Sequence, residues 1–67
     1  MNKLQESVAL AAYRDAKQTW PSVTREFIFE QAERVLAGKR PKGGPGMMVA
    51  DAFLRAGFIS TIPNKED

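Results

Sequence analysis

The stretch from Met47 to Ala56 sets the tightest limit on how this chain folds, because it is apolar on nearly every side. Only Asp51 and Arg55 are polar, and their spacing of four residues suits an ion pair on a helix. A helix that is apolar almost all round belongs in an interior. The rest of the chain, a second copy or a partner must cover it, and any face left uncovered would be a binding surface.

The length of the chain limits how much of that cover it supplies itself. With 67 residues it forms one domain, and such a domain buries only about 60% of the surface that its unfolded chain exposes. Small domains usually need disulfides, a bound metal or a partner chain. The sequence has no Cys and no His, which excludes disulfides and removes the commonest metal ligand. We therefore expect a homodimer, formed through apolar residues of the first and third helical segments.

The first helical segment is expected over about residues 3–19. Asn2 is placed to cap it, and Gln5 completes a capping box three residues later. Trp20 ends it, because the residue before a proline leaves the α region. Alanines along it allow another helix to approach closely, so the segment is able to lie between two neighbours. Its apolar arc covers about half of the helix and consists of Leu4, Val8, Ala9, Ala11, Ala12, Tyr13, Ala16 and Trp20.

The second helical segment is expected over about residues 23–37. Ser22 or Thr24 caps its start, and Gly38 is a natural stop. One stripe has the spacing of a helix that rests on a core: Ile28, Phe29, Ala32, Val35 and Leu36. Val23 and Phe27 fall outside this stripe. Either Trp20 and the chain entering the helix cover them, or they belong to a second contact surface.

The chain between the second and third segments, residues 38–46, is rich in Gly, Pro and positive charge, and it predicts a loop. The third helix then covers about residues 47–56. Gly57 followed by Phe58 predicts a Schellman ending in which Phe58 folds back on Phe53. The chain is thus expected to be all-α, a small three-helix bundle-like domain over residues 1–59 with a flexible C-terminal tail over residues 60–67.

The basic loop is the best candidate for a contact with an anion or an acidic partner. Lys39, Arg40 and Lys42 precede the start of the third helix, where backbone N–H groups and the helix dipole favour negative charge. The partner would be a phosphate backbone or an acidic protein surface. The alternative is a solubilising connection that meets only solvent. In either case we expect a mobile loop that adds little to stability, because it has almost no apolar area to bury.

Residue types that carry chemistry are scarce, so we expect no catalytic residue, no cofactor and no metal. Without His or Cys a nucleophile would have to be Ser, Thr, Lys or a carboxylate, and no serine lies in a nucleophile-elbow motif. The loop does not match the phosphate-binding pattern of Gly, four residues, Gly-Lys-Ser/Thr. The acidic row Glu26, Glu30 and Glu33 is typical of a solvated helix face. We expect that the chain is not an enzyme.

Location and charge give weaker indications. The N-terminus has no apolar core of a signal peptide, and the longest apolar run is too short to span a bilayer, so we expect a cytoplasmic protein without membrane contact. The net charge of +2 is mild and does not predict a nucleic-acid binder. A helix-turn-helix is disfavoured because the connection between the second and third segments is longer than the usual three- to four-residue turn.

These observations predict a small non-catalytic regulatory or inhibitory protein that acts by protein–protein interaction, as a homodimer and on another protein. The alternative is a DNA-binding transcriptional regulator that contacts phosphates through the basic loop, residues 39–42. The expected dimer or partner interface consists of Tyr13, Trp20, Phe27, Met47, Met48, Phe53, Leu54 and Phe58.

Overall fold

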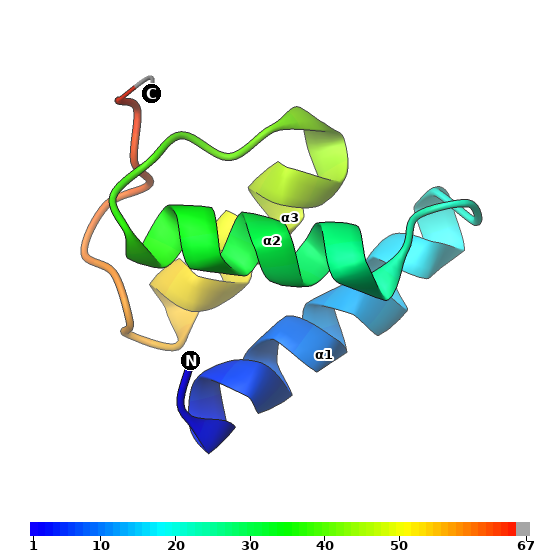
Figure 1. Cartoon of the computed structure of the whole chain (residues 1–67), viewed down its shortest axis with the longest axis horizontal. Helices are drawn as coiled ribbons and strands as arrows, with labels where there is room; N and C mark the ends of the chain where they lie inside the picture. Colours follow the sequence, from blue (N-terminus) through cyan, green and yellow to red (C-terminus); the bar gives the residue numbers. More distant parts are fainter. Residues whose placement is uncertain (66–67) are drawn as a thin grey trace.

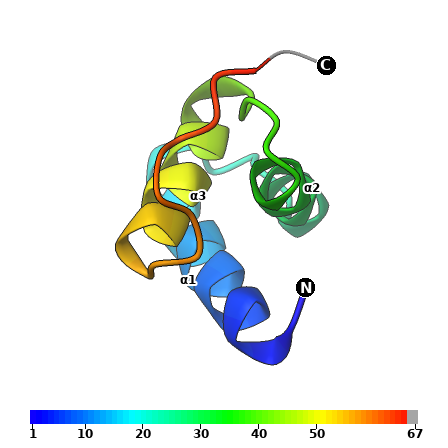
Figure 2. The same ribbon diagram turned by 90° about the vertical axis from the view of Figure 1, so that its left-hand side faces the viewer.

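The computed structural model describes residues 1–65. Within this range the regular secondary structure is entirely α-helical, as predicted. Three helices follow one another: α1 (Lys3–Thr19), α2 (Arg25–Leu36) and α3 (Gly43–Arg55) (Figure 1). Each helix packs against both of the others, so the core lies between all three. After α3 the chain turns back and runs past it toward the connection between α2 and α3 (Figure 2).

The capping signals of the first two helices are confirmed. The Asn2 side-chain oxygen accepts a hydrogen bond from the Gln5 N–H at 2.8 Å, and the Gln5 side chain accepts one from the Asn2 N–H at 3.0 Å. The Thr24 hydroxyl oxygen accepts one from the Phe27 N–H at 3.1 Å. These bonds satisfy backbone donors that have no partner within the helix.

The predicted Schellman ending of α3 is also confirmed. The Phe58 N–H donates to the Phe53 carbonyl at 3.0 Å and the Gly57 N–H to the Leu54 carbonyl at 3.1 Å. Gly57 has a φ of +83°, a left-handed conformation that glycine adopts without strain. The rings of Phe53 and Phe58 meet edge to face with centroids 5.5 Å apart.

The start of α3 differs from the prediction, because the helix begins at Gly43 rather than near Met47. Pro45 lies in the first turn, where a missing N–H costs no helical hydrogen bond. Gly44 and Gly46 are needed for packing rather than for a flexible loop. A Cβ on Gly44 would overlap the Trp20 ring. The glycines and the proline that predicted a loop therefore form the tightly packed first turn of α3.

The backbone of the connection between α2 and α3, which we expected to be mobile, forms hydrogen bonds with the rest of the chain. The Gln31 side-chain oxygen, in the interior, accepts from the Lys42 N–H at 2.7 Å. The Arg34 guanidinium donates to the Arg40 carbonyl at 2.7 and 3.1 Å. Pro41 between them is buried. The sequence pattern treated Pro41 as a loop residue and did not indicate that it is buried or that the neighbouring backbone groups are bonded.

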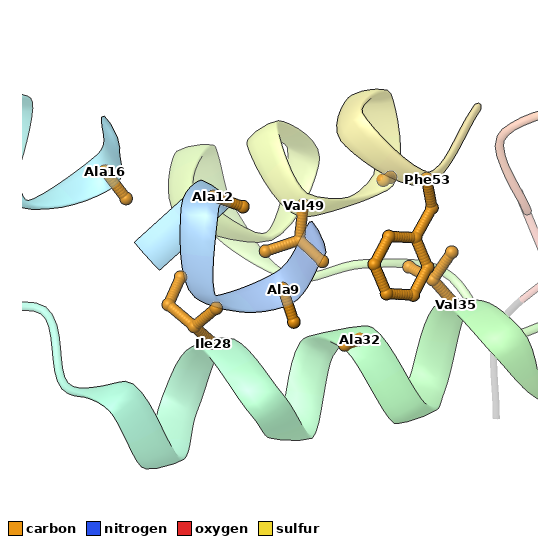
Figure 3. Packing of buried hydrophobic residues seen from close by; sticks show 9 residues of the cluster. Ala9, Ala12, Ala16, Ile28, Ala32, Val35, Val49 and Phe53 are labelled. Carbon is orange, nitrogen blue, oxygen red and sulfur yellow. The ribbon is translucent and has the colours of Figure 1, made fainter. Parts of the chain in front are cut away.

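The apolar core is small. Only four of its fully buried side chains are larger than alanine: Ile28, Val35, Val49 and Phe53 (Figure 3). The others are Ala9, Ala12, Ala16, Ala32 and Ala50. Half-buried residues complete the core from the outside, among them Ile62 of the expected tail. The Lys65 carbonyl accepts from the Arg40 N–H at 2.9 Å; residues 66–67 of that tail lie outside the described part of the chain.

Candidate functional site

The outer surface between α1 and α3 is hollowed into an open groove of about 400 Å³. Its walls are mostly short apolar side chains, which let the backbone of another helix approach closely. They are Val8, Ala11 and Ala12 of α1, Met48 and Ala52 of α3, and Ala56 directly after α3. We call this feature the α1–α3 groove.

Two exposed apolar side chains extend the surface of the groove. Leu4 is 65% exposed and lies one helical turn before Val8. Met47 is 47% exposed and lies one turn before Asp51. Residues four apart in a helix share a face, so both side chains continue the rows that border the groove. They are the only large apolar side chains within the three helices of the described chain that are exposed.

The groove carries charges of opposite sign toward its two ends. Helices α1 and α3 are antiparallel, since Trp20 at the end of α1 lies against Gly44 at the start of α3. Asp15 therefore lies toward the start of α3, and Arg55 lies toward the start of α1. Arg55 pairs with Asp51 at 2.8 Å. Asp15 forms no ion pair with any residue of the described chain.

The structure separates the residues that we expected to form one interface. Phe53 is completely buried by its own chain and is unavailable to a partner. Five others are half-buried and pack against the core: Tyr13, Trp20, Phe27, Met48 and Phe58. Leu54 is half-buried and Met47 exposed. Of the whole set, Met48 alone lines the α1–α3 groove. These large side chains fill the core of their own chain, because most of the other core residues are alanines.

Sequence reasoning left several groove residues out of the expected interface. The structure adds three charged residues, Asp15, Asp51 and Arg55, and the small residues Val8, Ala11, Ala12, Ala52 and Ala56. A signal was present, because Ala52 and Ala56 are four residues apart and the other small residues belong to the apolar arc of the first segment. Alanines occur equally in cores and on surfaces, so only the packing of the helices places these on the outside.

The three cations of the connection extend from a fixed backbone. Lys39, Arg40 and Lys42 are all exposed. The N–H groups of Arg40 and Lys42 are bonded within the chain. The connection therefore presents three basic residues beside the start of α3 without being a loose linker.

Comparisons with protein-family models, with curated proteins and with solved structures found no match. Within residues 1–65, no group of three or more acidic, His or Cys side chains is arranged to hold a metal ion. None of the helices in this range has the length and apolarity to cross a membrane. The groove and the basic connection are the two features of the described chain that bear on its function.

Proposed function

We propose that this chain is a small non-catalytic regulatory or inhibitory protein that acts through protein–protein contact, and that it works as a homodimer. The α1–α3 groove, bordered by the exposed side chains of Leu4 and Met47, is the observation that carries this proposal. An apolar surface with a polar edge is typical of a protein-binding site. Its alanines suit the packing of helix against helix.

The small core supports an assembled state. Five of the nine residues in the buried core cluster of the described chain are alanines, and each alanine contributes little hydrophobic free energy compared with a buried Leu or Phe. The chain has no disulfide to compensate. Covering Leu4, Met47 and the groove alanines with a second copy adds the apolar burial that so short a chain lacks.

Sedimentation velocity of the wild-type protein and two variants tests this proposal. Ala11 is exposed and lines the groove, so Ala11→Arg leaves the monomer folded but places a long charged side chain in the interface. Ala37→Arg is the matched control, because it makes the same change at an exposed position at the end of α2, outside the groove. We expect dimers for the wild type and the control at micromolar concentration, and monomers for Ala11→Arg. A monomeric wild type at millimolar concentration would refute the homodimer.

The regulatory role has its own test. The wild type and the chains carrying Ala11→Arg or Ala37→Arg are used as bait for partner proteins from a lysate, and the captured proteins are compared. Regulation through the groove predicts that a partner captured by the wild type and by the control is lost with Ala11→Arg. A partner captured equally by all three would place its contact elsewhere.

The exposed cations of the connection favour one second candidate, a DNA-binding regulator that contacts phosphates through residues 39–42. Gel shift with salt titration tests it, because each phosphate contact lowers the logarithm of the binding constant by roughly 0.9 for each tenfold increase in salt. We expect a Lys39→Ser, Arg40→Ser, Lys42→Ser variant to lose that salt dependence if the candidate is correct. Absence of binding at low salt would reject it.

A further inference from the structure

The charges of the α1–α3 groove indicate how two copies would meet. We infer that the groove faces the same groove of a second copy across a twofold axis that exchanges its two ends, and that Asp15 of each copy forms an ion pair with Arg55 of the other. The inference rests on the proposed homodimer and specifies its geometry.

Asp15 and Arg55 are both incompletely partnered within one chain. Asp15 forms no ion pair with any other described residue, although it borders an apolar groove. The Arg55 side chain is 80% exposed even though it contacts the Asp51 carboxylate. A guanidinium has five N–H donors, so Arg55 is able to bind a second carboxylate while it keeps Asp51.

The order of these charges along the groove selects one arrangement. Because α1 and α3 are antiparallel, Asp15 and Arg55 lie toward opposite ends. A twofold axis through the middle of the groove and perpendicular to the line from Asp15 to Arg55 places each Asp15 over the Arg55 of the other copy, and the contact occurs twice because the interface is isologous. With the axis along that line instead, Asp15 would face Asp15 and Arg55 would face Arg55, and like charges in an interface repel.

A second copy as the occupant requires a contact larger than the groove itself. The chain has 4315 Å² of accessible surface, and a standard interface takes about 800 Å² from each partner, roughly a fifth of that surface. To reach this area the contact must extend beyond the groove to Leu4 on one side and Met47 on the other. Both are exposed, and both continue the rows that border the groove.

Charge reversal and mixing test the inference. Asp15→Arg places two cations together at each contact, and Arg55→Asp places two carboxylates there. We expect each variant alone to raise the dimer dissociation constant by about tenfold or more. An equimolar mixture should regain the wild-type affinity as a heterodimer, because the introduced arginine of one chain then faces the introduced aspartate of the other. Native mass spectrometry distinguishes the three possible dimers by mass.

Two controls keep the result interpretable. Glu30→Arg makes the same charge change on α2, outside the groove, and we expect it to dimerise like the wild type. Asp15→Asn removes the charge without adding a cation, and it should weaken the dimer by several-fold. Circular dichroism establishes that every variant is helical before mixing.

The outcomes separate the pairing from the dimer. Preferential heterodimer formation supports the inference. A wild-type dimer whose charge variants neither weaken it alone nor prefer each other in the mixture overturns the Asp15–Arg55 pairing and leaves the homodimer standing. A wild type that is monomeric at millimolar concentration overturns the homodimer and the pairing with it.

Discussion

The two sides of α3 are built differently. On the side facing α2 and the end of α1, large or polar side chains close the structure: Phe53 is completely buried, Trp20 packs against Gly44, and Gln31 bonds the backbone of Lys42. On the side shared with α1, an alanine-lined groove stays open, bordered by exposed apolar and charged residues. The chain therefore completes one side by itself, and in the proposed homodimer a second copy covers the other.

The largest expected effect comes from breaking the closed side at its centre. Phe53→Ala removes a completely buried ring and its edge-to-face contact with Phe58. The free energy of unfolding should fall by about 3–5 kcal/mol, which is comparable to the whole stability of many small domains. Urea denaturation followed by circular dichroism measures the loss. A midpoint that barely moves would mean that Phe53 does not hold the closed side together.

The next effect tests the close approach at the start of α3. Gly44→Ala puts a methyl group where the Trp20 ring lies, and such overpacking should cost about 1–3 kcal/mol of unfolding free energy. In a Trp20→Ala background the same change should be neutral or slightly stabilising, because alanine is the better helix former. Equal costs of Gly44→Ala in both backgrounds, in a double-mutant cycle, would contradict the contact.

Gln31 provides a test of the polar part of the closed side. Gln31→Ala removes the acceptor for the Lys42 N–H and leaves a cavity, so the unfolding free energy should fall by about 1–2 kcal/mol. Gln31→Met is the matched variant. It keeps the volume and also removes a buried side-chain N–H group that has no partner in the described structure, so it should change the stability by less than about 1 kcal/mol. Equal losses of unfolding free energy in the two variants would contradict the cost that we assign to the cavity.

The smallest expected effect concerns the exposed cations of the connection. Replacing Lys39, Arg40 and Lys42 with Ser keeps the backbone hydrogen bonds and the buried Pro41. The melting temperature should therefore change by only a few degrees, as for most exposed substitutions. If the triple variant is unfolded at low temperature, the side chains rather than the backbone hold the connection in place.

Local signals in the sequence predicted much of the fold. The caps at Asn2 and Thr24 and the Schellman ending at Gly57 depend on residues close in sequence, and the structure confirms them. The start of α3 was missed because Gly44 and Gly46 serve contacts with Trp20 and Gln31, which are distant in sequence. No local pattern distinguishes such a glycine from one in a flexible loop.

The candidate site was less predictable than the fold. The apolar third segment indicated a helix in the interior, and this holds in part: α3 packs against both other helices, but only four of its thirteen residues are buried. It did not indicate which apolar residues stay outside. Large residues such as Phe53 and Phe58 pack in or against the core, whereas Ala11 and Ala56 line the open groove. That distribution depends on how the helices pack, and helical spacing alone does not determine it.

The concentration dependence of thermal unfolding tests most directly whether a second copy completes the open side, because it reports assembly and stability together. Wild type and Ala11→Arg are melted at concentrations from about 1 μM to 1 mM and followed by circular dichroism. Binding that stabilises only the folded state raises the melting temperature with concentration. We predict such a rise for the wild type and a constant melting temperature for Ala11→Arg. A wild-type melting temperature that is equally constant would contradict the account.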